Sequence, residues 1–212
     1  MKRWLALLLL LWVLPAAALE VAGVKVPEQT KVGAADLVLN GAGIRTRFVF
    51  KVYVGALYLG RKTSAAGEAL AQPGAKRVAL TLLRNLSADQ LKEAFEAGID
   101  ANNGAAELAT LKPRIAQLLA LFTDTKEGDV ILLDFVPGSG TVVTLNGAPD
   151  GKPIPGEDLY RALLRIWLGD KPVDGDLKKA MLGGVGLWRI TSSPRRSTRL
   201  RSAPCASTIR SR

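Results

Sequence analysis

NGAGIRTRFVFKVYVGALYLG, residues 40–60, is the most informative stretch of this 212-residue sequence. Residues 44–59 within it are rich in β-branched and aromatic side chains, which fit the pleated, half-buried surface of a sheet. They predict one long strand, or two strands with a bend near Gly55. Asp36 to Asn40 predicts a shorter strand in front of this stretch, and the Asn40-Gly41 pair predicts a turn that closes it.

The first half of the chain continues this strand pattern on both sides of the stretch. Residues 21–26 alternate weakly between apolar and polar side chains and predict an N-terminal strand. Lys76 to Leu83 predicts a further strand. The period then changes at Ser87, which has the features of a helix N-cap with Gln90 as its capping-box partner.

Two helices are expected after Ser87. The first ends at Asn103-Gly104, and its apolar face carries residues at helical spacing, namely Leu91, Phe95, Gly98, Ile99 and Asn102. The second contains Pro113, either near its first turn or at a kink. Its apolar face carries Leu108, Leu111, Ile115, Leu118, Leu119 and Phe122.

The second half of the chain returns to strands before its last helices. Asp129 to Val136 and Thr141 to Leu145 predict a hairpin, and Asn146-Gly147 predicts the turn that follows it. Helices are expected from about residue 156 to 168 and from 174 to 182. The order of strands, helices, strands and helices indicates an α+β fold, with helices against one face of a largely antiparallel sheet.

The N-terminus has the three regions of an export signal. Lys2 and Arg3 form a positive start, Trp4 to Leu14 is an unbroken apolar run, and Ala16 to Ala18 supplies small residues for a signal peptidase. The run is shorter than the ~20 residues that span a membrane, and no later segment approaches that length. We expect cleavage after Ala18 and a periplasmic or secreted protein with no stable membrane span. An uncleaved N-terminal anchor is the alternative.

Most of the positive charge lies outside the expected domain. The formal net charge is +10, but residues 188–212 hold seven arginines and no acid, and the domain without this tail and the N-terminal segment is nearly neutral. No nucleic-acid partner is therefore expected. The tail, residues 185–212, lacks apolar periodicity and is expected to be disordered. It fits either a basic arm for acidic lipid or nucleic acid, or out-of-frame translation of a GC-rich gene, and we favour the second interpretation.

The composition excludes several kinds of site. The chain has no histidine, and its single cysteine, Cys205, lies in the tail. Catalytic triads with histidine, most zinc sites, thiol chemistry and an internal disulfide are therefore not expected, and no metal or other cofactor is predicted. Gly41-x-Gly43 matches part of a dinucleotide-binding motif, but a strand rather than a helix is expected after it, so a turn is predicted there.

Three polar residues are candidates for a site because they lie among apolar ones. Arg45 begins the longest expected strand, and Tyr53, eight residues later, would point to the same side of an unbroken strand. Asn102 falls on the apolar stripe of its helix. An inward-facing arginine needs an anion or several acceptors, so Arg45 is the stronger functional candidate. The alternative is a structural arginine paired with a carboxylate such as Asp134, with Asn102 as a polar residue at a helix end.

Three segments resemble the chalcone isomerase-like superfamily. They are residues 40–60, FVPGSGTVVTLNG at residues 135–147, and ALLRIWLGDKPVDGDLKKAMLGG at residues 162–184. The resemblance covers roughly residues 21–184 and is to the exported bacterial members, so we expect a signal peptide at residues 1–18, a domain at 19–184 and a tail at 185–212. It implies an open-faced β-sandwich, in which helices pack on one face of a large antiparallel sheet.

The resemblance also implies which residues form the site. The plant enzymes of the family cyclise chalcones to flavanones, and their oxyanion-holding arginine corresponds to Arg45. In those enzymes a threonine and a tyrosine hold a water near the ketone. The threonine corresponds to Tyr53 here, with Tyr58 as the alternative. The tyrosine corresponds to Phe95, which has no hydroxyl. A further threonine corresponds to Ile166. An asparagine on the first long helix corresponds to Asn102.

An arginine and a tyrosine in an apolar cleft are similar to the fatty-acid-binding relatives, in which the two side chains hold a carboxylate. We therefore expect a protein that binds a small amphipathic carboxylate, such as a fatty acid, through Arg45, with Tyr53, Phe95, Asn102 and Ile166 around the ligand. One alternative is an isomerase of the intramolecular lyase type acting on an unknown enone, with Arg45, Tyr53 and Asn102 as catalytic residues. Another is an accessory protein with a vestigial pocket.

Overall fold

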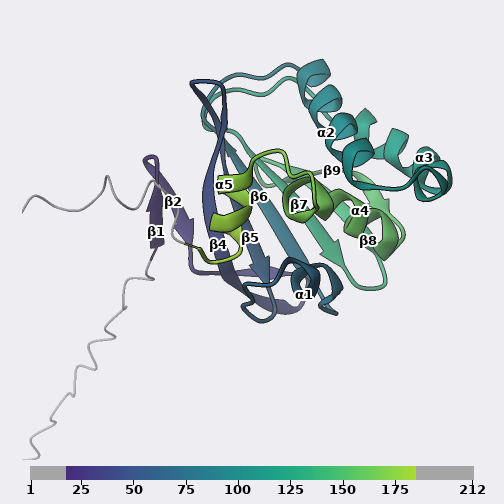
Figure 1. Ribbon diagram of the computed structural model, residues 1–212, viewed down its shortest axis with the longest axis horizontal. Helices are drawn as coiled ribbons and strands as arrows, with labels where there is room; N and C mark the ends of the chain where they lie inside the picture. The colour runs from purple at the N-terminus through teal and green to yellow at the C-terminus, as the bar shows by residue number, and fades with distance from the viewer. Residues whose placement is uncertain (1–17, 185–212) are drawn as a thin grey trace, which may run out of the picture.

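A computed structural model describes residues 18–184 of the chain. These residues form a β1–β2 hairpin and a curled seven-stranded sheet in the order β3-β4-β5-β6-β7-β8-β9, in which every pair of neighbours is antiparallel (Figure 1). The strands are β1 (Ala18–Val21), β2 (Val24–Pro27), β3 (Gln29–Val32), β4 (Ala35–Arg47), β5 (Phe50–Leu59), β6 (Lys76–Leu82), β7 (Val130–Val136), β8 (Gly140–Leu145) and β9 (Ala148–Ile154). The helices are α1 (Ala66–Ala71), α2 (Ala88–Asn102), α3 (Ala105–Ala120), α4 (Glu157–Leu168) and α5 (Gly175–Met181). The α+β fold class predicted from the sequence is confirmed.

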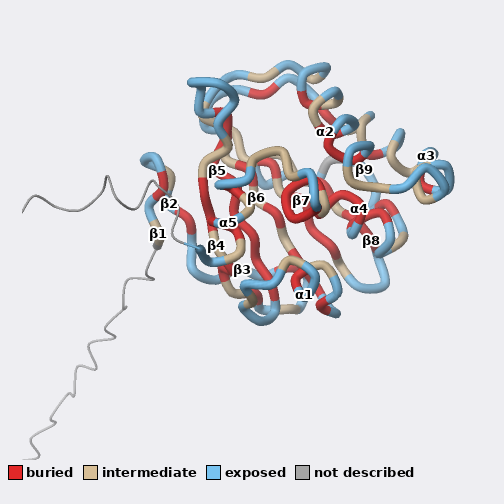
Figure 2. The backbone as a smooth tube through the Cα atoms, viewed as in Figure 1, coloured by how far each residue is buried: buried red, intermediate tan, exposed pale blue. Residues whose placement is uncertain are grey.

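The sheet has an apolar core on each face. On the helix-covered face, strand residues such as Leu57, Leu80 and Leu133 are buried against α2, α4 and α5. Helix α4 is buried along nearly its whole length (Figure 2), and its Tyr160 hydroxyl donates to the Leu133 carbonyl at 3.0 Å. A smaller core that includes Val54 lies on the opposite face, where the β1–β2 hairpin contributes to it. The larger core therefore lies beneath the helices.

Most of the expected elements are present. Ser87 caps α2 with the predicted capping box to Gln90, and α2 ends before Asn103-Gly104. Pro113 lies inside α3, which continues through it. The Asn146-Gly147 turn is formed, and both of its residues have positive φ. Strands β3 and β9 and helix α1 were not expected from the sequence. Strand β9 was missed because its two prolines and a glycine are unusual in a strand.

The predicted turn at Asn40-Gly41 is wrong, because β4 runs straight through it for 13 residues. The two glycines serve close packing instead. A Cβ atom at Gly41 would collide with the Ala180 carbonyl oxygen of α5, and one at Gly43 would lie 2.6 Å from the Ala180 Cβ. The glycines therefore let α5 lie directly on the backbone of β4.

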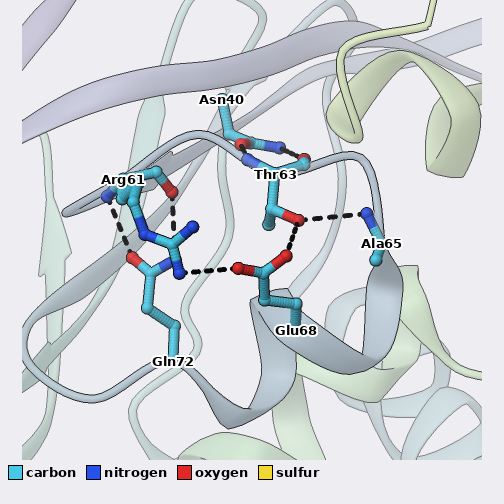
Figure 3. Close-up of polar contacts among 6 residues, drawn as sticks. All are labelled: Asn40, Arg61, Thr63, Ala65, Glu68 and Gln72. Atoms are coloured by element: carbon cyan, nitrogen blue, oxygen red, sulfur yellow. Dashed lines mark hydrogen bonds and ion pairs between the residues drawn. The ribbon is translucent and has the colours of Figure 1, made fainter.

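Asn40 is buried where the turn was expected, and its amide joins three parts of the chain. Its Nδ2 donates to the carbonyls of Met181 at 2.7 Å and Thr63 at 3.0 Å, and its Oδ1 accepts from the Thr63 N–H. Figure 3 shows how this network continues from Thr63 to Glu68, which also pairs with Arg61. The hydrogen bond from Thr63 and the neighbouring Arg61 lower the pKa of Glu68. Asn40 thus fixes β4 to the end of α5 and to the β5–α1 connection.

Residues 44–59 form neither one strand nor a strand bent at Gly55. Strand β4 ends at Arg47, a tight turn follows at Phe48-Val49, and β5 returns beside β4 with Phe50 opposite Arg47. Residues 21–26 likewise divide into β1 and β2 at a turn. The sequence did not reveal either turn, since both lack the usual Asn-Gly or Asp-Gly pair.

The predicted signal peptide and the arginine-rich tail lie outside the described residues, apart from Ala18, which begins β1. Within residues 18–184, no helix is long and apolar enough to cross a membrane.

Candidate functional site

A cavity of about 470 Å³ lies between α2 and the helix-covered face of the sheet. The end of β4 and the start of β5 close one side of it, and the C-terminal end of α4 with the following loop closes another. The lining is Arg45, Arg47, Val52, Tyr53, Leu80, Leu82, Arg84, Leu86, Gln90, Leu91, Glu93, Ala94, Phe95, Ala97, Gly98, Ala101, Ile166, Trp167, Lys171 and Val173. Four of the five predicted site residues, Arg45, Tyr53, Phe95 and Ile166, therefore line one cavity.

Arg45 and Tyr53 come together across a hairpin and not along one strand. They are directly opposite each other in the β4–β5 register, and side chains of opposite residues lie on the same face of a sheet. The expectation that they share a side is confirmed, although the unbroken strand from which it was argued does not exist. The Phe48-Val49 turn produces this juxtaposition.

The guanidinium of Arg45 lacks a full set of partners within the described chain. Its Nε is buried and has no hydrogen-bond partner there, while its Cζ lies 5.6 Å from the centroid of the Tyr53 ring. Asp134, the carboxylate suggested as a structural partner, instead forms a two-pronged ion pair with Arg77, with both N···O distances at 2.6 Å. Arg45 also lines the cavity, so its guanidinium is available to an acceptor there.

The hydroxyl of Tyr53 is held in place from one side. The Trp167 Nε1–H donates to the Tyr53 Oη at 2.9 Å, so the hydroxyl hydrogen of Tyr53 remains free to be donated. Burial raises the pKa of Tyr53 above its ordinary value, and the positive charge of Arg45 opposes this only in part. The group therefore remains a neutral hydrogen-bond donor at physiological pH.

Apolar side chains form the walls next to these two donors. The Phe95 ring packs on Phe122 with ring centroids 4.6 Å apart and edge-on against Trp167 at 5.8 Å. Gly98 permits close contact between α2 and α4, since a Cβ there would lie 2.9 Å from a methyl carbon of Ile166. Phe95 and Ile166 carry no hydroxyl, so the wall offers contact area and no hydrogen bonds.

Asn102 is not in the cavity lining, so the structure does not bring it together with Arg45 and Tyr53. Its Nδ2 donates to the carbonyls of Gly98 at 3.0 Å and Lys171 at 2.8 Å, and its Oδ1 accepts from the Lys171 N–H at 2.9 Å. The side chain thus joins the end of α2 to the loop after α4. A polar residue on an apolar stripe here marks a helix end fixed by hydrogen bonds, which is the structural alternative that the sequence left open.

Tyr58, the alternative to Tyr53, belongs to the other face of the sheet. It packs in the smaller core, and its hydroxyl donates to the Pro27 carbonyl at 3.0 Å. Burial raises its pKa to about 12.

Sequence reasoning missed Trp167, whose indole N–H orients Tyr53. One signal was present, because a tryptophan on an otherwise apolar helix needs a partner for its N–H when it is buried. No sequence pattern indicated that the partner would be Tyr53, 114 residues away.

Among residues 18–184, no group of three or more acidic, histidine or cysteine side chains is placed to hold a metal ion. The arrangement can bind an anionic or strongly polar oxygen, because two donors, the Arg45 guanidinium and the Tyr53 hydroxyl, belong to side chains that line one partly apolar cavity.

Fold and site together define an α+β protein with a ligand-sized cavity between a curled antiparallel sheet and its helices. Residues 18–183 match the chalcone isomerase-like family, and the chain belongs to it. Among solved structures, the chain is similar to a fatty-acid binding protein of Arabidopsis thaliana. The two share 15% sequence identity with a TM-score of 0.58, over 76% of this chain and 92% of that one. No curated protein sequence matches the chain.

Proposed function

We propose that the protein binds a small amphipathic carboxylate, such as a fatty acid, in the cavity beneath α2. The observation that carries this proposal is the buried Arg45 Nε without a hydrogen-bond partner, next to the Tyr53 hydroxyl. A carboxylate accepts from both groups at once, and a charge-assisted bond to a guanidinium is stronger than a neutral one. The ligand would supply the acceptor that residues 18–184 do not.

The remaining lining suits the acyl part of such a ligand. Leucine, alanine, valine and aromatic side chains of β5, β6 and α2 supply the apolar part of the wall, beside arginine, lysine, glutamine and glutamate side chains. The volume of about 470 Å³ falls within the range of ~300–1,000 Å³ found for small-molecule pockets. Membership of the chalcone isomerase-like family and the fold shared with a protein described as fatty-acid binding add support.

The second candidate function is an isomerase acting on an enone. The same pair of donors would stabilise an oxyanion that develops during the reaction, which is often a large catalytic contribution. Against it, Phe95 and Ile166 place no hydroxyl at the positions where the resemblance implies water-holding or threonine side chains. Carboxylate binding is therefore the preferred function.

We also propose that the protein acts in the periplasm or outside the cell, on the basis of the export signal expected at residues 1–18. N-terminal sequencing of protein recovered from the periplasm should begin at or near Leu19. Soluble periplasmic protein that retains Met1 would contradict the expected cleavage after Ala18.

A calorimetric titration tests the binding proposal. Oleate and methyl oleate share one acyl chain, but the ester carries no negative charge. Because the proposal places the carboxylate on Arg45, oleate should bind at least tenfold more tightly than the ester. Equal affinities would contradict the head-group assignment, and no binding of either, nor of shorter-chain carboxylates, would contradict the proposed function.

A further inference from the structure

The tip of the β4–β5 hairpin presents three large apolar side chains to solvent. The exposed fractions are 87% for Phe48, 84% for Val49 and 58% for Phe50, and within residues 18–184 these are the exposed large hydrophobic residues. Figure 2 shows this tip as an exposed end of the molecule. Single exposed apolar residues are common on protein surfaces, whereas a contiguous group marks an interaction site.

Phe48 is also unsuited to its backbone position. Its φ is 57°, in the left-handed region where residues other than glycine, asparagine and aspartate are unfavourable. It is the first residue of a two-residue turn, so glycine or asparagine would be the stable choice. Neither packing nor turn geometry accounts for phenylalanine here. Strain of this kind is characteristic of functional positions.

Basic side chains surround the apolar tip. Arg45, Arg47 and Lys51 belong to the hairpin, and residues 41–60 contain no acid. Arg84, on the β6–α2 connection, has its Cζ 5.3 Å from the Phe50 ring centroid, and the Arg47 Cζ lies 6.0 Å from that of Phe48.

One nearby carboxylate is already engaged. Asp174 accepts the Thr46 N–H and caps α5. These N–H groups are neutral and leave the charge of Asp174 unchanged. Within residues 18–184, however, Arg47, Lys51 and Arg84, the basic collar of the tip, form no salt bridge, so their positive charge is left for an anionic surface.

The cavity opens beside this tip. Arg47 and Arg84 are both exposed and both line the cavity, so they mark its opening. In Figure 1, the β4–β5 turn and the β6–α2 connection lie at the same end of the molecule. The apolar tip, the basic collar and the cavity opening thus occupy one region.

We propose that this region docks the protein on an anionic lipid surface. Phe48, Val49 and Phe50 insert at the boundary between head groups and acyl chains, while Arg47, Lys51 and Arg84 pair with lipid phosphates. Aromatic and apolar residues next to arginine and lysine are the combination that binds such interfaces. Docking would place the cavity opening against the lipid, so that an acyl chain can pass from the lipid into the cavity. This passage rests on the proposed function, whereas the docking does not.

Vesicle binding of the full chain tests the docking. With vesicles of phosphatidylcholine and phosphatidylglycerol at 7:3, F48S/F50S should lower the affinity at least tenfold, because two aromatic side chains no longer insert. R47S/R84S should lower it roughly thirtyfold. K62S/K152S, which removes the same charge from exposed positions elsewhere, is the matched control and should change it less than twofold. All variants keep the same arginine-rich tail, so its contribution cancels in these ratios.

Phe48→Asn separates docking from folding. Asparagine tolerates the left-handed backbone, so the melting temperature should rise while vesicle affinity falls several-fold. Affinity for oleate in solution should stay the same, because Phe48 does not line the cavity. A purely structural Phe48 would show the reverse, with a lower melting temperature and unchanged vesicle affinity.

A probe at the tip reports insertion directly. V49C/C205S labelled with an environment-sensitive fluorophore should shift to the blue on anionic vesicles, whereas K62C/C205S should not. Unchanged affinity of F48S/F50S would overturn the docking proposal, and is the result expected if the tip instead binds a protein. Tip-dependent vesicle binding by a chain that binds no oleate would contradict the proposed function and leave the docking intact.

Discussion

Arg45→Ala is expected to weaken ligand binding while leaving the fold nearly as stable as before. The substitution removes a guanidinium whose buried Nε has no partner in the described chain. Loss of a charge-assisted hydrogen bond to a carboxylate should cost ~1.5–3 kcal/mol of binding free energy, which is roughly a tenfold to hundredfold fall in oleate affinity. Arg45→Lys should restore only part of it, because the planar fork of arginine is lost.

The effect on stability follows from the same contacts. Removing Arg45 loses its contact with the Tyr53 ring at 5.6 Å, worth ~0.5–1 kcal/mol. This loss is offset because an unsatisfied buried donor is also removed. The free energy of unfolding should therefore change by less than about 1 kcal/mol.

Arg77→Ala is the matched control on the opposite face of the sheet. It would strand Asp134 and the Thr30 hydroxyl, both hydrogen-bonded to Arg77 at 2.6 Å. Breaking such a largely buried pair should lower the free energy of unfolding by ~3–5 kcal/mol, with no change in the oleate affinity of the folded protein. Urea unfolding and calorimetric titration measure the two quantities. If Arg45→Ala destabilises the protein as Arg77→Ala does while oleate affinity is retained, Arg45 is a structural residue and does not bind the carboxylate.

Further predictions concern the neighbouring residues. Tyr53→Phe should weaken oleate binding by ~0.5–1.5 kcal/mol in the same titration, because one neutral donor is lost. Asn102→Ala should lower the free energy of unfolding by ~1–3 kcal/mol in urea, through its three backbone hydrogen bonds, without changing oleate affinity; a selective loss of affinity would restore its predicted binding role. Gly41→Ala should destabilise the fold by ~1–3 kcal/mol or more, since its Cβ would meet the Ala180 carbonyl oxygen, and a neutral effect would show that α5 shifts easily. With Phe95 and Ile166 in the wall, a simple hydroxychalcone should not be cyclised above the background rate, and robust turnover by spectrophotometry would favour the isomerase alternative.

The elements that the sequence predicted well are those with a strong local pattern. The capping box at Ser87 and the stripe from Leu91 to Ile99 specified α2 almost to the residue. The turns at Ala22-Gly23 and Phe48-Val49 were missed because β-branched and aromatic residues continue up to or across them. Gly41 was misjudged because glycine serves both turns and close packing, and only the position of α5 decides between them.

Prediction of the site residues from the sequence was limited in the same way. Arg45 was identified because an arginine at the head of an apolar strand is chemically unusual, and Tyr53 because it shares a face with Arg45. Asn102 was given a ligand role because it corresponds to an asparagine of the family, yet its partners are the backbone of Gly98 and of Lys171, 69 residues further along the chain. A polar side chain among apolar residues indicates a specific partner. Its identity depends on tertiary contacts that local sequence does not encode.

The hydrogen bond from Arg45 Nε to a bound carboxylate is the central claim, and nitrogen-15 NMR observes it directly. The Nε–H resonance of Arg45, assigned by its disappearance in Arg45→Lys, should shift downfield and exchange more slowly with water when oleate is added, and should not respond to methyl oleate. An Nε–H resonance that is unaffected by saturating oleate would contradict the account.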